Sequence, residues 1–155
     1  MKGIYPLRKV IMCHRCDYEG LLNRGGLNRT SNRLRVLEVI GNSSSPLSVQ
    51  EVFEILNRTR NIDRVTVYRI LDLLVERKLA DRISSGDRSF RYGLAPNANH
   101  QPHYHFYCTH CGDMECLDPE SLHLNMESIM RTFPGFIEKA EVRLDGICKN
   151  CLKKK

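Results

Sequence analysis

The sequence has no apolar run that approaches the length a membrane-spanning helix needs, about 18 residues or more. It also lacks the positively charged opening followed by an apolar segment that marks a secretory signal peptide. Internal repeats are absent, and biased composition is limited to the serines at 43–45 and the terminal lysines. We therefore expect a cytoplasmic protein with no membrane partner.

Complete disulfide pairing within the chain is excluded, because the number of cysteines, seven, is odd. Seven is also many for a cytoplasmic protein, in which thiols stay reduced. Metal binding or catalysis is the more common use of cysteine in that compartment. The spacing of the cysteines must decide between these uses.

The positive charge is confined to one part of the chain. Residues 1–95 hold 17 Lys and Arg against 10 Asp and Glu, a balance of +7, whereas residues 96–155 hold 7 against 8, a balance of −1. Fourteen of the 17 basic residues are arginines. This asymmetry favours a polyanion-binding N-terminal part joined to a part with a different task.

Four helices and a hairpin are predicted in the basic part. A first helix is predicted over Asp17–Arg24, and capping residues predict further helix starts at Thr30–Ser31, at the capping box SVQE (48–51) and at Asp63. The fourth helix has one apolar face, made of Val67, Ile70, Leu71 and Leu74. The alternation of Phe90, Tyr92 and Leu94 after a turn at 84–87 predicts a β-hairpin. Helices followed by a hairpin in a basic segment indicate a winged helix-turn-helix.

The outward face of the fourth predicted helix is the candidate DNA-reading surface. If the apolar face is buried, Val65 and Arg69 point away from the core, where Arg can bind a guanine edge and Val a thymine methyl. The arginines of the hairpin, Arg82, Arg88 and Arg91, are candidates for phosphate contacts. The helical candidates are Arg64, Val65, Thr66, Tyr68 and Arg69. An ordinary solvated face is the alternative.

The C-terminal part is predicted to be a small α+β unit. Residues 95–103 contain two prolines and no apolar period, which is typical of a linker. Two short strands around Cys111–Gly112 are expected next, then a helix that begins at Asp118–Pro119 and a last strand over residues 136–148. The helix face is made of Leu122, Met126, Ile129, Met130 and Phe133, expected as core or dimer interface. A unit this small usually needs a metal or a partner subunit.

Two Cys-x-x-Cys pairs are the most specific signal in the chain: Cys108 with Cys111, and Cys148 with Cys151. Two such knuckles complete a tetrahedral thiolate shell, so we expect a structural zinc ion. Redox dithiols are the alternative, but they usually occur in a βαβ context that neither pair has. A third pair, Cys13 and Cys16, lacks further ligands, and we expect free thiols there.

At this point the motifs match a known family. GLNRTSNRLRVLEVI (26–40), RVTVYRILDLL (64–74), HYHFYCTHCG (103–112) and DGICKNC (145–151) resemble the ferric uptake regulator (Fur) family in order and spacing. The resemblance covers roughly residues 18–152. It implies a homodimeric, metal-responsive repressor, not an enzyme, that reads an AT-rich inverted repeat in double-stranded DNA and takes no small-molecule substrate. Tyr68 and Arg69 match the family's DNA contacts, and Arg29 could replace its minor-groove lysine, which falls on Asn28.

The resemblance also implies a domain organisation. It consists of an N-terminal extension (1–16), a winged-helix DNA-binding domain (17–95), a hinge (96–102) and a dimerisation and metal-binding domain (103–155). The expected fold class is therefore α+β, a winged helix-turn-helix followed by a small α/β dimerisation domain with a four-cysteine zinc site.

A second, regulatory metal site is implied at the hinge. His103 and His105 alternate along a predicted strand and so share a face, and the resemblance places them among the sensing ligands. Two further family ligands are missing, at Pro46 and Gly93, and Cys116 replaces an acid. His100 and Cys116 could complete a set of three nitrogens and one sulfur, which suits zinc, cobalt or nickel better than an oxygen-rich iron or manganese site. Zinc or iron is the regulatory metal that we expect here. A secondary site of the family is replaced by Tyr104, His123 and Ala140.

Three other functions remain open. A peroxide- or thiol-redox-responsive regulator of the same fold would hold iron at His103 and His105 or oxidise Cys116. A zinc-bearing thiol oxidoreductase would need an exposed cysteine with a low pKa. A zinc-ribbon interaction module would bind no DNA, which the basic helix and wing argue against.

Overall fold

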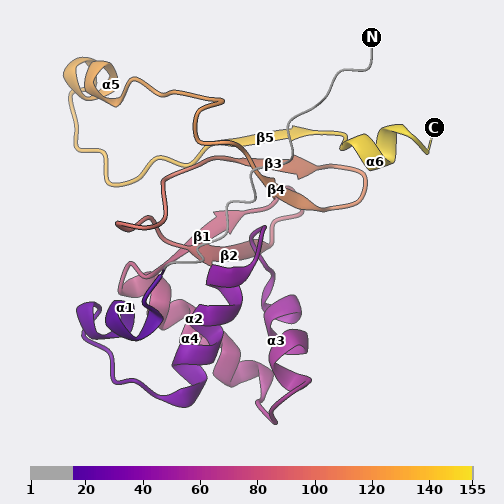
Figure 1. Cartoon of the computed structure of the whole chain (residues 1–155). Coiled ribbons are helices and arrows are strands. Elements are labelled where there is room, and N and C mark those ends of the chain that lie inside the picture. Colours follow the sequence, from indigo (N-terminus) through magenta and orange to yellow (C-terminus); the bar gives the residue numbers. More distant parts are fainter. Residues whose placement is uncertain (1–15, 155) are drawn as a thin grey trace.

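The structure is a computed structural model that describes residues 16–154. The elements are α1 (Tyr18–Arg24), α2 (Ser31–Asn42), α3 (Val49–Asn57), α4 (Arg64–Glu76), β1 (Ala80–Ser84), β2 (Phe90–Leu94), β3 (His105–Cys108), β4 (Met114–Cys116), α5 (Met126–Thr132), β5 (Arg143–Gly146) and α6 (Lys149–Leu152). Helices α1–α4 lie at one end, the β1–β2 hairpin lies in the middle, and a three-stranded sheet lies at the other end (Figure 1). The predicted α+β class is confirmed. Within the described residues, no helix is long and apolar enough to cross a membrane.

Helices α2, α3 and α4 begin where their capping residues predict, and Asp17, expected as the first residue of α1, is its cap. Asp17 accepts the N–H of Gly20 at 3.0 Å, and Asp63 accepts that of Thr66 at 2.8 Å. Ser48 and Glu51 form the complete capping box of α3. Each cap satisfies donors that the first helical turn leaves without intrahelical partners.

One hydrophobic core unites α1–α4 with the hairpin. Its fully buried members are Leu22, Val36, Leu37, Val52, Val67, Leu71 and Leu74. The predicted apolar face of α4 is buried in this core, and the opposite face is open. Burial of each Leu or Val stabilises the fold by roughly 1.5–3 kcal/mol, so the core gives α4 a fixed orientation.

The C-terminal sheet has the strand order β4-β3-β5. Strand β3 pairs antiparallel with β4, His105 opposite Cys116, and parallel with β5, His105 opposite Arg143. The short helix α6 follows β5 and packs its cysteines toward the β3–β4 turn. The sheet therefore brings residues from three separate stretches of sequence to the neighbourhood of His105.

Two predicted boundaries in this part are wrong. The helix expected at Asp118–Pro119 begins at Met126, with Asn125 as its cap, and Asp118 instead closes a turn with Ser121. No residue of α5 is buried, so little tertiary packing stabilises further turns of this helix, although Met126 lines the cavity beside the sheet. The last strand covers only Arg143–Gly146, since it can pair only along the four residues of β3.

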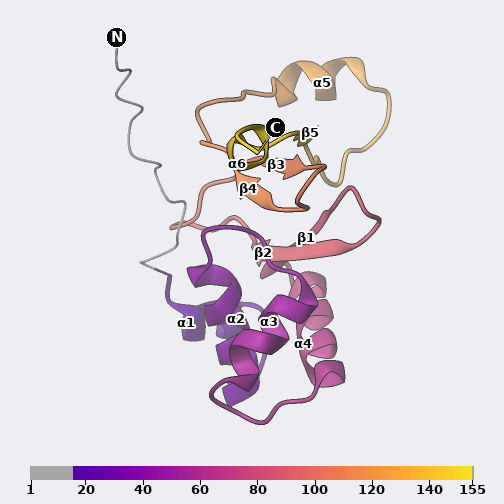
Figure 2. The same ribbon diagram turned by 90° about the vertical axis from the view of Figure 1, so that its right-hand side faces the viewer.

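The hairpin packs directly against the C-terminal sheet. Ile83 of β1 shares a small buried cluster with Tyr107 and Met114. Ser84 donates its N–H to Glu141 at 2.9 Å, and Arg143 donates to the carbonyl of Ser84 at 2.9 Å. The view in Figure 2 shows the hairpin between the helices and the sheet. The winged helix is thus docked on the unit that carries the cysteines.

Gly86, in the turn of the hairpin, should be sensitive to a single added methyl group. A Cβ at this position would lie 2.5 Å from Cε1 of the buried Tyr107 ring. We expect Gly86→Ala to lower the free energy of unfolding by about 1–3 kcal/mol, measured by urea denaturation. Gly93→Ala is the matched control, because its Cβ would meet only Ile83, at 3.7 Å. Equal stabilities for the two variants would contradict the packing described.

Candidate metal centres and DNA-facing helix

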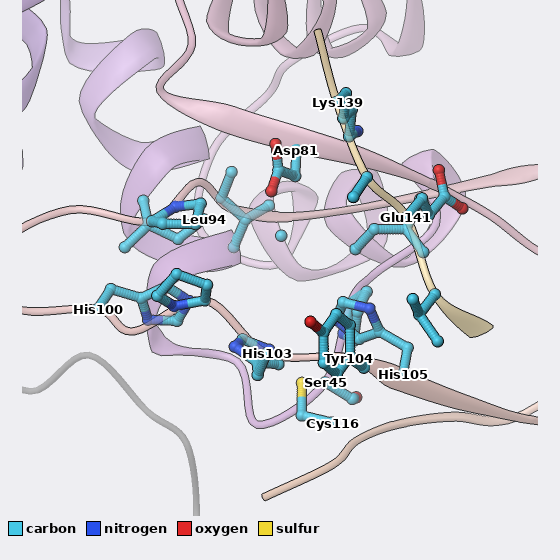
Figure 3. Close-up of a pocket in the computed structure, with 18 of the residues that line it drawn as sticks. Ser45, Asp81, Leu94, His100, His103, Tyr104, His105, Cys116, Lys139 and Glu141 are labelled. Atoms are coloured by element: carbon cyan, nitrogen blue, oxygen red, sulfur yellow. The ribbon is translucent and has the colours of Figure 1, made fainter. Parts of the chain in front are cut away.

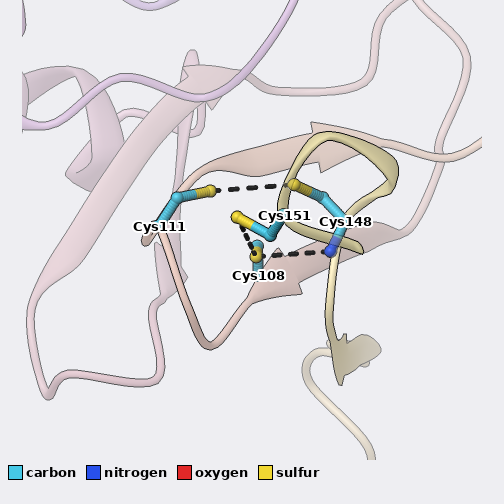
Figure 4. Close-up of side chains that lie close together, drawn as sticks. All are labelled: Cys108, Cys111, Cys148 and Cys151. Atoms are coloured by element: carbon cyan, nitrogen blue, oxygen red, sulfur yellow. Dashed lines mark hydrogen bonds between the residues drawn. The ribbon is translucent and has the colours of Figure 1, made fainter. Parts of the chain in front are cut away.

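Four cysteines from two elements converge at the end of the C-terminal sheet. Cys108 ends β3 and Cys111 lies in the following turn, whereas Cys148 caps α6 and Cys151 lies within it. All four sulfurs lie within 4.8 Å of one another. The Sγ–Sγ distance is 3.9 Å from Cys108 to Cys151 and 3.8 Å from Cys111 to Cys148 (Figure 4).

The four sulfurs fit a tetrahedral zinc ion. Zinc–sulfur bonds of about 2.3 Å require sulfur–sulfur distances of roughly 3.8 Å in a tetrahedron. Backbone N–H groups of Cys111 and Cys148 lower the pKa of Cys108 to about 6, whereas hydrogen bonds between the thiols raise the pKa of Cys111 and of Cys151, so Cys108 is the thiol that ionises first in the absence of a metal. Four protein ligands leave no open position, so a zinc ion held here would be structural.

A second cluster of ligand-type side chains lies between the winged helix and the sheet. His103, His105 and Cys116 place their ligand atoms within 4.8 Å of one another. The ring of His103 lies 4.9 Å from that of His105 and 5.2 Å from that of His100, centroid to centroid. The structure thus brings all four candidate residues to one cavity of about 240 Å³ (Figure 3). We call it the hinge cavity.

Burial shifts the pKa values of these side chains toward their uncharged forms. Burial lowers the pKa of His105 to about 4, and it also lowers the pKa of His100. His105 is therefore neutral at pH 7, with a nitrogen lone pair available as a ligand. Burial raises the pKa of Cys116 to about 11, so its thiol keeps its proton until a cation displaces it.

Asp81 is a functional candidate that the sequence motifs missed. It lies on β1, directly opposite Gly93 of β2, and it lines the hinge cavity. Side chains at opposed positions of two antiparallel strands share a face. Burial raises the pKa of Asp81, and Lys139 and His103 partly offset this effect. Figure 3 shows its carboxylate across the cavity from His103 and Cys116. The cross-strand register with Gly93 was the signal that could have revealed it.

The positions where family ligands are absent also fall on this cavity. Pro46 and Gly93 line it without offering a ligand atom. Tyr104 and Ala140, two of the three replacements at the secondary site, line it as well. His123 is exposed in the stretch between β4 and α5 and joins neither metal cluster within the described residues.

The outward face of α4 presents the predicted DNA-contacting side chains. Val65 and Tyr68 are 57% and 49% exposed, and Arg69 is exposed beside them. Arg64 lies over the ring of Phe53, 5.5 Å from its centroid. The hydroxyl of Thr66 donates to Asp63 at 2.6 Å, so part of its hydrogen-bonding capacity serves the helix cap.

The arginines outside α4 differ in what they contact. Arg29 pairs with Glu19 at 2.5 Å on an exposed surface, where an ion pair contributes little. Arg88 is exposed at the tip of the hairpin, with a positive φ of 67°. Arg82 lies over the ring of Phe90. Arg91 is not available for a phosphate, because it forms an ion pair with Glu51 and its side chain is only 18% exposed.

The N-terminal cysteine pair differs from expectation. Cys16 is disulfide-bonded, so the prediction of a free thiol is wrong for this residue. Cys13 lies outside the described residues. The side-chain amide of Asn97 donates to the sulfur of Cys16 at 3.7 Å, which places this cysteine against the linker that carries His100.

Comparison with known proteins identifies the family. Residues 24–142 match the ferric uptake regulator family. The chain belongs to the Fur family. The ferric uptake regulation protein of Bacillus subtilis is 32% identical to this Fur-family chain over 119 residues, which cover 76% of the chain and 78% of that relative.

Solved structures share the fold of the Fur-family chain. The ferric uptake regulator Fur of Helicobacter pylori, described with three functional metal-binding sites, has a TM-score of 0.68 and 22% identity, and the match covers 87% of this chain and 93% of that one. A zinc uptake regulator complexed with zinc and DNA has a TM-score of 0.61 and 22% identity, and the match covers 88% and 91% of the two chains. The winged helix and the cysteine-bearing sheet therefore form a Fur-family regulator fold.

The half-buried thiol of Cys116 should react slowly at neutral pH. With a pKa of about 11, roughly one thiol in ten thousand is ionised at pH 7, and the thiolate is the reactive form. We expect alkylation by iodoacetamide to accelerate about tenfold per pH unit between pH 6 and 9. Mass spectrometry of protein with zinc on the four-cysteine cluster would measure the rate. Rapid modification at pH 7 would instead favour the thiol-redox regulator.

Proposed function

We propose that this Fur-family chain is a metal-dependent transcriptional repressor that senses zinc at the hinge cavity and binds double-stranded DNA as a homodimer. The observation that carries the proposal is the cluster of His103, His105 and Cys116 at the junction of the winged helix and the sheet. A metal held there would touch both parts of the chain. The four-cysteine cluster would hold a separate, structural zinc ion.

The donor set favours zinc over iron and manganese. Imidazole nitrogens and a thiolate are softer ligands than the carboxylates and waters that manganese prefers. His103, His105 and Cys116 supply three ligands, and either His100 or Asp81 lies in the same cavity to supply the fourth. A set of two or three imidazoles, one thiolate and at most one carboxylate is typical of tetrahedral zinc.

The placement of Asp81 suggests how metal binding reaches the DNA. Asp81 belongs to the winged helix, whereas His105 and Cys116 belong to the C-terminal sheet. A zinc ion that takes ligands from both would favour the arrangement in which the winged helix is held against the sheet. In a homodimer this arrangement sets the separation of the two α4 helices, and half-sites one helical turn apart, roughly 34–36 Å, would follow.

The DNA-binding part of the proposal rests on α4 and the charge distribution. The exposed face of α4 combines Arg64, Arg69 and Tyr68 with an apolar Val65, a set suited to a major groove. Arg29 and Arg88 are proposed to contact the phosphate backbone, and Thr66 the DNA near the helix start. The same proposal divides the chain into a DNA-binding domain (17–95), a hinge (96–102) and a dimerisation domain (103–155). The DNA target that we propose is an AT-rich inverted repeat, and the protein would bind it in the cytoplasm.

A second copy of the chain is the proposed partner of the C-terminal part. Met130, Phe133 and Phe136 are 61%, 50% and 85% exposed, and Leu144 of the edge strand β5 is 47% exposed. An exposed apolar group of this kind marks an association surface. An interface on α5 and β5 would bury it and leave α4 free for DNA.

Zinc should strengthen DNA binding through the hinge cavity. We expect zinc, added to protein whose four-cysteine cluster is already loaded, to raise affinity for an AT-rich inverted-repeat duplex about 5- to 150-fold. Fluorescence anisotropy at fixed salt, with iron(II) and manganese(II) in parallel, would measure the response. The variant His103→Ala/His105→Ala should lose it, and Asp81→Asn should weaken it.

His110→Ala is the matched control for that experiment, because His110 is exposed in the turn between two of the clustered cysteines, outside the hinge cavity. Its zinc response should equal that of the unmodified chain. DNA affinity that is indifferent to every metal would refute zinc sensing at this cavity. A response to iron(II) alone would assign the sensing role to a different metal.

Arg69 should contribute directly to DNA affinity. Because a bidentate arginine–guanine contact is worth about 1–3 kcal/mol, we expect Arg69→Ala to weaken binding to the cognate duplex about 5- to 150-fold. Lys153→Ala is the control, since Lys153 is exposed at the end of α6, outside α4 and outside the proposed interface on α5 and β5. Band-shift titrations of both variants at equal salt would compare them. If both bind like the unmodified protein, α4 is not the reading helix.

A further inference from the structure

Arg91 of β2 joins two parts of the molecule that the proposed function does not connect. Its guanidinium donates to Glu51 at 3.0 Å and, from the other terminal nitrogen, to the backbone carbonyl of Gly112 at 2.9 Å. The side chain is only 18% exposed. A mostly buried, bidentate guanidinium is stiff and strongly oriented. Arg91 thus connects α3 to the β3–β4 turn, and we call this pair of contacts the bracket.

The carbonyl of Gly112 is part of the four-cysteine knuckle. Gly112 directly follows Cys111, and its N–H donates to the carbonyl of Cys108 at 2.9 Å. Its φ of +76° is a conformation that favours glycine. The direction of this carbonyl therefore depends on the turn that holds Cys108 and Cys111 at the metal distance.

The other end of the bracket is the start of α3. Glu51 closes the capping box there by accepting the N–H of Ser48 at 2.7 Å. Arg91 therefore neutralises the carboxylate that caps the helix. Val52, the next residue, is fully buried in the core that also holds Val67 of α4. A movement of the Gly112 carbonyl can therefore reach the packing of α3 against α4 through Arg91 and Glu51.

We propose that Arg91 is a positioning residue that couples zinc at the four-cysteine cluster to the start of α3. The zinc-held turn presents the Gly112 carbonyl, Arg91 binds it, and the same guanidinium fixes Glu51. The structural zinc thus orders the winged helix as well as its own knuckle. The proposal is independent of the hinge metal, and it assigns to Arg91 a role other than phosphate binding.

The coupling must work in both directions. If zinc at the cluster stabilises the start of α3, the ordered start of α3 must in turn stabilise bound zinc. Loss of the bracket should therefore loosen the helix cap and speed zinc release together. A merely structural arginine would affect stability without linking these two readouts.

The test is amide hydrogen exchange at residues 48–52 in zinc-loaded and zinc-stripped full-length protein, with one zinc per chain in the loaded state. In the unmodified chain, we expect zinc removal to accelerate exchange there about tenfold or more, as the loss of a charge-assisted hydrogen bond implies. In Arg91→Ala, exchange should be fast in both states, with less than about a twofold zinc effect.

Three further variants separate coupling from general damage. Arg91→Lys can reach one acceptor but not both, so it should restore only part of the zinc effect. Glu51→Gln keeps the capping box and removes the charge that holds Arg91, and it serves if Arg91→Ala fails to fold. Arg88→Ala is the matched control from the same hairpin, and its zinc effect should equal that of the unmodified chain.

The second readout is the rate at which a chromogenic chelator takes zinc from the cluster. We expect Arg91→Ala and Glu51→Gln to release zinc about tenfold and severalfold faster, respectively, and Arg88→Ala at the original rate. A zinc effect at residues 48–52 that persists undiminished in Arg91→Ala would overturn the proposal. So would exchange that ignores zinc in the unmodified chain.

Discussion

Four cysteine sulfurs take the place of a hydrophobic core in the C-terminal part of this chain. Only a few side chains there are buried, chiefly Tyr107, Met114 and two of the cysteines themselves. The three-stranded sheet is short, and α5 contributes no buried residue. A metal ion that joins the β3–β4 turn to α6 would supply the cross-link that apolar packing does not. The hinge cavity takes His105 and Cys116 from β3 and β4, and the bracket made by Arg91 ends on Gly112 in the turn between these strands, so both adjoin the segment that such a metal would hold.

Features that depend on local chemistry were predictable from the sequence. The caps at Ser48 and Asp63 were predicted because a capping side chain acts on donors two or three residues away. The buried face of α4 follows from its own period, and the pairing of two Cys-x-x-Cys knuckles follows from zinc geometry. In each case the groups that interact are close in sequence, or the fixed geometry of a metal site defines which residues must meet.

Features that depend on distant partners were not predictable in the same way. The predicted start of α5 was wrong because a helix is extended by tertiary packing as well as by its apolar period, and no residue of α5 is buried within the described part of the chain. Asp81 was overlooked because its relevance rests on its register with Gly93 and on the approach of the sheet. Arg91 was assigned to phosphates because its charge is visible in the sequence, whereas Glu51 and the Gly112 carbonyl are brought to it only by folding.

The opposition of Asp81 and Gly93 has a consequence for how relatives of this chain are compared. Side chains at two opposed positions on one face of a hairpin point into the same space. An acidic residue at either position can therefore place its carboxylate there without any change in the backbone of the hairpin. Homologous positions in an alignment and equivalent positions around a cavity are then different things. A comparison made column by column finds glycine at position 93 and no acid there, whereas a comparison made by spatial neighbourhood finds the carboxylate of Asp81 at the same cavity. Relatives of this chain are therefore better compared around the cavity as well as along the sequence.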